Sequence, residues 1–542
     1  MAHSFDLTSE GWIPCVMHDG QQEDLSLYDA LMRAAEVREV FDESPLVTVS
    51  LHRLMLAILH RNFGPATFKA WQVLWTAGNW DTEKLAAYFQ TWRHRFDLFD
   101  EERPFYQAQL MNDAENHPAV LLKQEAATGN NATLFDHSFN DAPASLTPAE
   151  AARCLVARQA FSIGGGISNP FNFYGSTLTR GINVLALGNN LFETLMLNLM
   201  VYNEETPIAG TNRDMPAWEQ KTPVIPKKEG TPLSGYLDYL TWQSRRIHLI
   251  VEGEPTFVRR CQIQQNLRLL ESPLIFDPFK CYRYNKEKGY QPLPLSTSKA
   301  LWRDSHTLFQ KATQESDQAA KRPEVFSQLA RIDEARSEDQ IEARETYAFA
   351  VYGFATDPGK AASVLQWARE RLPLPLRYLD DQVLVDRLGD ALRFADEEVA
   401  RTLRESVRYL AKLLLAPNSD AKGARQPDKN DIGNLASSFT AEAFYWSRLE
   451  PHFKSLFTEL PHDAHMEFGE KRYGEVTLPQ WARTLRQTAR AAFENTTRSL
   501  DTSARNLKAV AIAERQFKRN LGAKVKEFIA QNAGTVSTGG DE

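Results

Sequence analysis

The chain has 542 residues, of which 43% are hydrophobic and 11% aromatic, so it can bury large cores; at about 150 residues per domain, two to four domains are expected. Its 62 Lys and Arg face 70 Asp and Glu, and the net charge of -8 excludes a generic polyanion binder and leaves nucleic-acid contact to local basic patches. The four cysteines are scattered without a CxxC pair, so neither a disulfide scaffold nor a zinc site is predicted.

No targeting or membrane segment is predicted. The first 14 residues contain neither the basic segment nor the apolar core that a secretory signal needs. No stretch approaches eighteen uninterrupted apolar residues, and the most apolar helix, residues 46–63, carries His52, Arg53, His60 and Arg61. We therefore expect a soluble, cytoplasmic protein that makes no contact with a membrane.

The first hundred residues combine extended and helical patterns. A strand-like stretch spans residues 11–17 and ends at an Asp-Gly turn. Ser44 followed by Pro45 is typical of an N-cap with a proline in the first helical turn, so a long helix is predicted from this point. A further helix is predicted from its N-cap, Asp81, to about Arg95.

The middle of the chain is richer in loops. Residues 112–183 are rich in Asn, Gly, Ser and Pro, and the polar stretch 129–143 contains Leu134 and Phe135 without a helical or strand period. A long irregular loop of this kind is more often functional than structural. The regular elements expected here are a helix at 148–161 and strands at 239–251 and 279–284, so this part is α+β.

After residue 379 the pattern becomes almost purely helical. Apolar residues spaced by three or four from Leu388 to Leu414 form one stripe of a long amphipathic helix. Three further helices are predicted at 433–457, 479–500 and 502–530, and four long helices joined by loops predict a four-helix bundle. The predicted domains are a mixed α+β domain over 1–379, the bundle over 380–530 and a disordered tail over 531–542.

The search for catalytic motifs is negative, because the sequence has no GxGxxG, GxxxxGK, HExxH or GxSxG pattern. His462 and His465 could place two imidazoles near one metal ion, which defines the alternative of a metal-dependent nuclease or hydrolase. They lie beside Pro461 between two predicted helices, where solvated loop residues are the simpler interpretation. No catalytic residue, metal or cofactor is predicted.

Other titratable pairs also have simple interpretations. His52 and His60 are eight residues apart on one predicted helix, about 12 Å along its axis, which is too far for joint coordination. They are expected to be core or surface histidines. The adjacent pairs Glu101-Glu102 and Asp380-Asp381 would not face one another on a helix or strand, so solvated charges are expected.

Basic residues are concentrated near the C-terminus. Residues 481–530 contain eleven Lys and Arg against four Asp and Glu, a local charge of +7 in a chain of -8. Arg483, Arg486 and Arg490 follow at i, i+3 and i+7, so they share one face of the predicted helix. Contact with a polyanion and pairing with acids of a neighbouring helix are both open at this point.

A second unusual feature is the triplet Gly164-Gly165-Gly166, flanked by Ser162, Ser168 and Asn169. Without Cβ atoms the chain can take positive φ angles and approach a ligand closely. Short polar neighbours suit phosphate oxygens or base edges. The alternative is a flexible turn without a ligand.

Several blocks of the sequence follow one another in a recognisable order. They are Phe5-Asp6-Leu7, Trp12-Ile13-Pro14, Ser44-Pro45-Leu46, Leu51 to Arg61, Pro104 to Gln107, Gly164 to Gly166, Leu240 to Arg246 and Phe444-Tyr445-Trp446. In this order they resemble the CasA family, the large subunit of the type I-E CRISPR surveillance complex Cascade. The resemblance covers about residues 5–521.

The resemblance implies a wedge-shaped N-terminal domain, a C-terminal four-helix bundle and no enzymatic activity. It implies a subunit that recognises the PAM, a short motif flanking the target, in double-stranded DNA and mainly from the minor groove. It further implies help in strand opening, recruitment of a helicase-nuclease after target binding, and contacts with guide RNA and other Cascade subunits. Guide pairing would supply most of the sequence specificity, and the degenerate minor groove suits a permissive motif.

Carried over residue by residue, the resemblance assigns the contact residues. The DNA-reading glycine loop is Gly164, Gly165 and Gly166, and the minor-groove lysine is Lys286 or Lys288, with Lys286 preferred. The strand-separating wedge falls within 353–360, where well-known members carry a glutamine that this chain lacks. The wedge candidates are therefore Thr356 and Lys360, and the loop expected to meet the guide and a neighbouring subunit has Leu134, Phe135 and Asp136 at its tip.

Two other hypotheses are kept. The first is the metal-dependent nuclease or hydrolase described above. The second is a purely structural assembly subunit, whose basic helices touch only protein or guide RNA.

Overall fold

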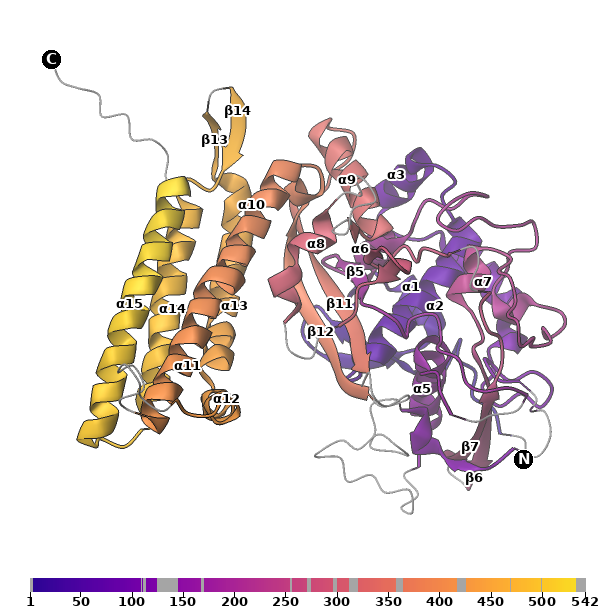
Figure 1. The fold of residues 1–542 in the computed structure, drawn as a ribbon. Helices are drawn as coiled ribbons and strands as arrows, with labels where there is room; N and C mark the ends of the chain where they lie inside the picture. Colours follow the sequence, from indigo (N-terminus) through magenta and orange to yellow (C-terminus); the bar gives the residue numbers. More distant parts are fainter. Residues whose placement is uncertain are drawn as a thin grey trace. The chain divides into compact units, whose positions relative to one another are not determined.

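The chain divides into two compact units by its internal contacts. A computed structural model of the full chain describes residues 3–108, 110, 114–123, 145–166, 170–253, 256–270, 274–295, 300–310, 320–356, 364–416, 426–467, 469–498 and 500–532. The first unit comprises 1–301 and 311–372, and the second comprises 302–310 and 373–542. Helices and strands mix in the first unit, whereas the second is mainly helical (Figure 1).

Small antiparallel sheets form the strand component of the first unit. In the part of the chain that the structure describes, the orders of the three-stranded sheets are β2-β1-β3, β4-β7-β6, β10-β8-β9 and β12-β11-β5. The strands are β1 (Ile13–Met17), β2 (Gln22–Leu25), β3 (Val37–Val40), β4 (His117–Pro118), β5 (Asn183–Leu187), β6 (Arg245–Glu252), β7 (Phe257–Gln265), β8 (Tyr282–Asn285), β9 (Gly289–Pro292), β10 (Ala320–Lys321), β11 (Thr346–Thr356) and β12 (Val364–Pro375).

The strand predicted at 11–17 is present as β1, but the one predicted over 239–251 is partly wrong. A short helix, α7 (Tyr236–Leu240), occupies the start of that stretch, and β6 begins only at Arg245. The carboxylate of Asp214 accepts hydrogen bonds from the backbone N–H groups of Leu237 (3.1 Å) and Asp238 (2.9 Å), so a distant residue stabilises the first turn of α7. Local periodicity does not contain this tertiary contact.

Helix α2 (Pro45–Phe63) lies at the centre of the first unit, packed against α5, α7 and β11. Its predicted N-cap is confirmed, because the Ser44 hydroxyl accepts the N–H of Val47 at 3.4 Å. The helix is buried on all sides between Pro45 and His60, which makes His52 and His60 core histidines. The other helices of this unit are α1 (Leu27–Met32), α3 (Phe68–Ala77), α4 (Thr82–Trp92), α5 (Pro148–Phe161), α6 (Leu191–Asn198) and α9 (Glu324–Ser337).

Burial of His60 predicts a specific acid sensitivity. Both of its ring nitrogens lack a hydrogen-bond partner among the described residues, the side chain is 1% exposed, and burial lowers its pKa to about 3. In the unfolded chain a histidine has a pKa of about 6.5. Between these two values the unfolded state binds the proton and the folded state does not, so stability falls as the pH falls through this window.

We expect His60→Leu to remove this pH dependence. Between pH 7.5 and pH 5.0 the protein should lose about 2 kcal/mol more unfolding free energy than the variant loses. Denaturant midpoints at the two pH values give the difference, and the same substitution at the exposed His18 is the control. Equal acid sensitivity of the protein and of His60→Leu would contradict the prediction.

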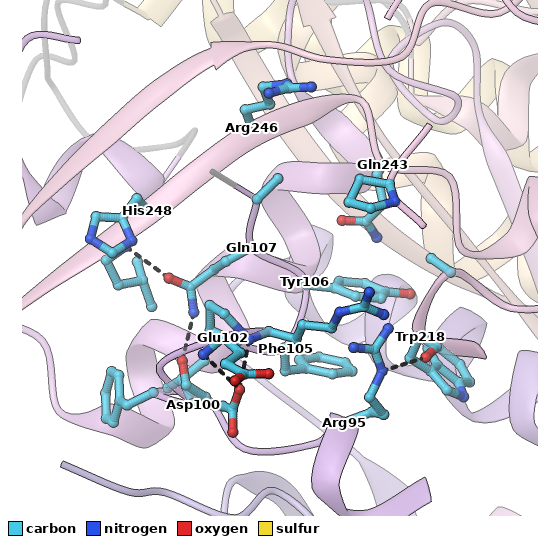
Figure 2. A pocket seen from close by; sticks show the side chains of 18 of the residues that line it. Arg95, Asp100, Glu102, Phe105, Tyr106, Gln107, Trp218, Gln243, Arg246 and His248 are labelled. Carbon is cyan, nitrogen blue, oxygen red and sulfur yellow. Dashed lines mark hydrogen bonds between the residues drawn. The ribbon is translucent and has the colours of Figure 1, made fainter. Parts of the chain in front are cut away.

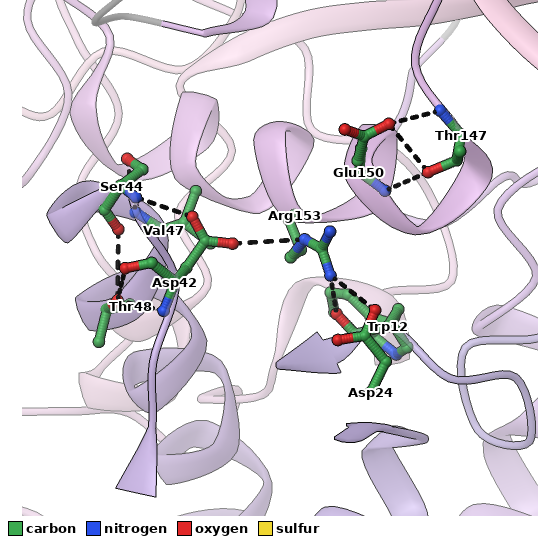
Figure 3. A network of polar contacts seen from close by, with 9 residues as sticks. All are labelled: Trp12, Asp24, Asp42, Ser44, Val47, Thr48, Thr147, Glu150 and Arg153. Atoms are coloured by element: carbon green, nitrogen blue, oxygen red, sulfur yellow. Dashed lines mark hydrogen bonds and ion pairs between the residues drawn. The ribbon is translucent and has the colours of Figure 1, made fainter. Parts of the chain in front are cut away.

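Helix α5 leads directly into the glycine triplet, and polar contacts fix it at its start. Thr147 and Glu150 form a capping box, as Figure 3 shows. One turn later, the Arg153 guanidinium lies 3.4 Å from Asp42, just before α2, and 3.1 Å from Asp24 in β2 (Figure 3). These contacts tie the first turns of α5 to the start of α2 and to the β2-β1-β3 sheet, and so they help to orient the helix that leads to the glycine triplet.

The second unit consists mainly of long helices that lie along one another (Figure 1). The stripe predicted from Leu388 to Leu414 lies on one continuous helical stretch, which comprises α10 (Gln382–Arg393), a π-helical segment (Phe394–Ala400) and α11 (Arg401–Leu415). Helix α11 packs against α15, and α14 packs against both α13 and α15. The remaining helices are α8 (His306–Phe309), α12 (Lys429–Ser438), α13 (Ala441–Glu459), α14 (Thr477–Arg498) and α15 (Ala504–Asn532).

Two predictions for this unit are corrected. The helix expected at 433–457 is split into α12 and α13, because Phe439 takes an extended backbone conformation (φ -85°, ψ 118°). The stretch around His465 is not a loop, since β13 (Ala464–Glu467) pairs antiparallel with β14 (Glu470–Tyr473). The turn of this hairpin includes Gly469 at φ +84°.

A membrane-spanning helix is not found: within the described ranges, no helix combines the length and the apolar character needed to cross a bilayer.

Candidate nucleic-acid interface

The glycine triplet follows α5 and turns the chain. Gly165 and Gly166 have φ angles of +101° and +89°, in the region that L side chains rarely adopt. A Cβ on Gly164 would lie 2.9 Å from the backbone nitrogen of Gly175, so Gly164 permits two backbone segments to approach closely. The triplet thus serves two purposes, a close backbone contact at Gly164 and an unusual turn at the next two residues. Gly166 is the exposed member.

The segment 173–179 forms the other side of this glycine loop. The N–H of Gly165 donates to the carbonyl of Phe173 (2.9 Å), and the N–H of Ser176 donates to the carbonyl of Ser162 (2.8 Å). The same carbonyl of Ser162 accepts the hydroxyl of Thr179 at 2.8 Å. The two sides are therefore bridged at several points; Ser168 and Asn169, predicted as polar neighbours, lie outside the described residues.

Arg245, the first residue of β6, fastens both sides of the loop. Its Nη2 donates to the carbonyls of Ile163 (2.8 Å) and Tyr174 (2.7 Å), which lie on opposite sides. Its Nη1 donates to the carbonyl of Ser244 (3.0 Å) and to Oε1 of Gln265 (2.9 Å). The residue is 1% exposed, and burial, helped by nearby Arg158, lowers its pKa well below the usual range.

Arg245 is a positioning residue that the sequence analysis did not identify. No carboxylate among the described residues pairs with it, so carbonyl and amide oxygens alone satisfy its planar fork of donors. The only sequence signal was its place in the Leu240 to Arg246 block. A lone arginine at the start of a strand otherwise resembles any surface charge.

Further basic groups surround the loop. The Arg268 guanidinium lies 3.8 Å from the centre of the Tyr174 ring. The Lys280 Nζ donates to the carbonyl of Thr177 at 2.6 Å, and burial lowers its pKa to about 8. Arg268 and Lys280 thus place positive charge beside the loop, although the chain as a whole is acidic. A local positive field is what contact with phosphates requires.

The hairpin β8–β9 presents both candidate lysines at its tip. Lys286 and Lys288 are exposed, and the side chain of Asn285 accepts the N–H groups of Glu287 (2.9 Å) and Lys288 (3.0 Å). Gly289 closes the turn at φ +67°. The turn therefore holds the two lysines in solvent on a short and well-paired hairpin.

The base of this hairpin adjoins the segment that follows the glycine loop. The N–H of Ile182 donates to the carbonyl of Leu293 (2.9 Å), and a Cβ on Gly181 would lie 2.5 Å from Cβ of Pro292. Lys280, just before β8, adds the bond to Thr177. The structure therefore brings the glycine loop and the lysine hairpin into one connected region of the first unit.

The other predicted contacts of the first unit are placed only in part. Thr356 is the last residue of β11. Lys360 lies outside the described residues, and so do Leu134, Phe135 and Asp136.

The three arginines predicted as a basic face lie on α14. Arg483 is exposed, whereas Arg486 and Arg490 are half-buried. The Nε atoms of Arg486 and Arg490 are buried without a hydrogen-bond partner among the described residues. Within those residues none of the three forms an ion pair. The described structure therefore does not show the alternative interpretation, in which these arginines pair with acids of a neighbouring helix.

A second line of basic residues runs along α15, which the sequence analysis counted but did not place. Because each residue of an α-helix advances by 100° around the axis, the four residues of this line lie within about 20° of one another's mean direction. They span about 27 Å along the axis. All are exposed, and no ion pair to them is found in the described ranges. Lys518 and Lys524, by contrast, pair with Glu514 and Glu398. The line consists of Lys508, Arg515, Arg519 and Lys526.

The histidines of the hydrolase hypothesis are not assembled into a ligand set. His462 ends a 3₁₀ turn and His465 lies in β13, where its Nδ1 is 3.7 Å from a carboxylate oxygen of Glu475. Across the described part of the chain, no three His, Cys, Asp or Glu residues lie close enough to hold a metal ion.

Comparison with known proteins identifies the family. The family model of CRISPR-associated protein Cse1 matches residues 6–492. The CRISPR-associated protein CasA/Cse1 of Thermus thermophilus is 31% identical over 529 residues, which is 96% of this chain and 97% of that protein.

Solved structures agree in fold. The structure of Thermus thermophilus CasA (Cse1) has a TM-score of 0.76 at 28% identity, covering 96% of this chain and 99% of the other. Cse1 from Acidimicrobium ferrooxidans has a TM-score of 0.78 at 25% identity, covering 97% and 99%. A chain in a structure of a CRISPR RNA-guided surveillance complex shares the fold (TM-score 0.71, 21% identity, 95% and 99% covered). The chain therefore belongs to the CRISPR-associated CasA/Cse1 family, as its ordered sequence blocks predicted.

Proposed function

We propose that this protein is the large subunit of a type I-E Cascade complex and recognises the PAM in double-stranded target DNA, mainly from the minor groove. The observation that carries the proposal is the connected pair of the glycine loop and the lysine hairpin. A backbone without Cβ atoms can approach the floor of a narrow groove, and a lysine suits its acceptor atoms and phosphates. The basic groups around the loop supply the attraction that the acidic chain lacks overall.

The same proposal includes the finer roles that the resemblance implies. The fold would be a wedge-shaped N-terminal domain and a four-helix bundle, without enzymatic activity. Thr356 or Lys360 would part the first base pairs. The loop tip at Leu134, Phe135 and Asp136 would meet guide RNA and a neighbouring subunit, and the protein would recruit the helicase-nuclease after target binding.

The proposal is tested by target binding of the guide complex reconstituted with and without this protein. Duplexes carrying the PAM and duplexes with a scrambled PAM are compared at fixed salt. A gain in affinity that appears only with the protein and only on the PAM-bearing duplex is expected. An assembled complex whose binding is the same with and without the protein would instead favour the structural assembly hypothesis.

Replacing Arg483, Arg486 and Arg490 by alanine is expected to flatten the salt dependence of DNA binding. Removing one phosphate-binding side chain lowers the slope of log K against log salt by about 0.9, so removing three would lower it by about 2.7. The measurement is the affinity of the reconstituted complex between about 50 and 200 mM salt.

Lys518→Ala is the matched control for this measurement, because Lys518 is exposed but pairs with Glu514 one turn away. Its slope should equal that of the unmodified complex. A triple alanine variant at Lys508, Arg515 and Arg519 tests the line on α15 in the same way. An unchanged slope for the α14 variant would show that its arginines do not contact phosphates.

A further inference from the structure

A cavity of about 770 Å³ lies in the first unit, and none of its lining residues belongs to the glycine loop. Its walls are the loop from Arg95 to Ala108, the stretch 217–224, and the strand β6 with its neighbours Asn266 and Leu267 (Figure 2). This volume lies in the range of ligand sites, about 300 to 1,000 Å³. The lining mixes apolar side chains with guanidinium, carboxylate and amide groups.

One wall of the cavity is the edge of a sheet. In the order β4-β7-β6, described above, β6 is the outer strand, and the consecutive residues His248, Leu249, Ile250 and Val251 all line the cavity. Successive side chains of a strand point to opposite faces, so consecutive lining residues mean that the backbone edge itself is reached. An open edge presents N–H and C=O groups in a row.

The chain already pairs with part of this edge. The N–H of Ala108 donates to the carbonyl of Ile247 (3.2 Å), and the N–H of Leu249 donates to Oε1 of Gln107 (2.8 Å). Gln107 in turn donates through Nε2 to the carbonyl of Leu98 at 2.6 Å. Its carboxamide therefore accepts and donates as the peptide group of an added strand would (Figure 2).

Among the residues that the structure describes, no hydrogen bond continues this pairing beyond Leu249. In an antiparallel ladder the N–H and C=O of one residue face the same side. Because the N–H of Leu249 faces Gln107, its carbonyl also faces away from β7. Among the described residues no partner for that carbonyl lies on the cavity side. The edge of β6 thus offers an acceptor along the cavity beyond Gln107.

The loop that carries Gln107 has an unusual backbone. Tyr106 has a φ angle of +56°, which a residue with a large side chain rarely adopts. Its ring is stacked on Phe105 at 4.4 Å, and Tyr106 is 9% exposed, so packing holds this conformation. Strained backbone conformations that are held by the surrounding packing are found preferentially at ligand sites. Here it sets the direction in which Gln107 and Ala108 run along β6.

The charges of the lining favour one class of ligand. Three arginines (Arg95, Arg103 and Arg246) stand against three carboxylates (Asp100, Glu101 and Glu102). Equal numbers of both signs disfavour a polyphosphate chain, which needs a positive field. Figure 2 shows Arg246 on the opposite side of the cavity from Asp100 and Glu102. The lining therefore suits a ligand that carries an acidic and a basic group some distance apart.

We propose that this cavity binds an extended peptide segment of a partner protein, which adds to the edge of β6 through its main chain. An acidic side chain of the segment faces Arg246, and a basic one faces Asp100 and Glu102. Main-chain hydrogen bonds supply affinity in this mode of recognition, and side-chain pockets supply specificity. The cavity shares no lining residue with the glycine loop, so peptide binding can be absent while DNA recognition holds.

The test uses the full-length protein and a fluorescein-labelled, end-blocked hexapeptide of alternating threonine and valine, with aspartate at one end and lysine at the other. Saturable binding by fluorescence anisotropy is expected. Two further peptides carry N-methyl groups on alternate backbone nitrogens, one on the odd positions and one on the even positions. One of them should bind at least about tenfold more weakly than the unmodified peptide, because it lacks the N–H donors that face the edge of β6. This comparison needs no variant protein.

Arg246→Glu should weaken binding of the peptide about tenfold, and Arg260→Glu, on the neighbouring strand and outside the cavity lining, should not. Labelled hexathymidylate is the competing probe. No saturable peptide binding, equal binding of both N-methylated peptides, or equal effects of the two charge reversals would each overturn the proposal. Tighter binding of hexathymidylate than of the peptide would overturn it in favour of a nucleic-acid ligand.

Discussion

Gly166→Val is expected to lower the affinity of the assembled complex for PAM-bearing duplex by about tenfold or more. Gly166 is the exposed residue of the glycine loop and has a φ angle of +89°. A β-branched residue held there costs about 1–3 kcal/mol, so the loop must either store that strain or move. Its new side chain would also stand where DNA is proposed to approach. A decrease of about 1.4 kcal/mol in binding free energy corresponds to tenfold.

Gly20→Val is the matched control for Gly166→Val. Gly20 lies in the turn between β1 and β2 at φ +86°, and nothing lies within 4 Å of an added Cβ, so the backbone penalty is the same at a position outside the loop. Both variants should lose similar unfolding free energy, but only Gly166→Val should lose PAM-dependent affinity. Binding to scrambled-PAM duplex should change little in either. Equal losses of affinity in the two variants would contradict the proposed role of the glycine loop in PAM recognition.

Arg245→Met is expected to destabilise the protein by about 3–5 kcal/mol and to remove most PAM-dependent binding. The substitution keeps an apolar stem but removes the donor to the buried Oε1 of Gln265 and to the part-buried carbonyls of Ile163 and Tyr174. Each buried acceptor left unpaired costs about 1–3 kcal/mol. Arg245→Lys should recover only part of this stability, because one ammonium cannot reproduce the planar fork that reaches both sides of the loop.

The salt dependence of DNA binding distinguishes a positioning role of Arg245 from a general loss of folded protein. Arg245 is buried and touches no phosphate, so its substitution should lower affinity without changing the slope of log K against log salt. Arg260→Met is the control, since the exposed Arg260 pairs with Glu252 on the surface and such pairs contribute about 0–1 kcal/mol. Unfolding free energy and salt-dependent affinity are the measurements. A reduced salt slope in Arg245→Met would contradict the positioning role.

Patterns that act over a few residues were predicted well from the sequence. The N-cap at Ser44, the helix over 148–161 and the stripe from Leu388 to Leu414 are present, because capping and amphipathic spacing are local properties. The family was also predicted, since ordered motifs do not depend on knowing their contacts. The local pattern failed where a distant side chain intervenes, as Asp214 does at the first turn of α7.

For the candidate site, the sequence by itself predicted the glycine loop and the family, and the resemblance to that family added the hairpin lysines. It could not distinguish the close backbone approach at Gly164 from the positive φ angle at Gly166, because either requirement is met by a glycine and the sequence shows only the glycine. It could not identify Arg245 as a positioning residue, because three of the four oxygens around that guanidinium come from distant segments of the chain. Nor could it find the cavity along β6, because an open strand edge exists only once the sheet has formed. The sequence determines which chemical groups are present and in what local conformation, whereas burial and the meeting of distant segments depend on the folded chain.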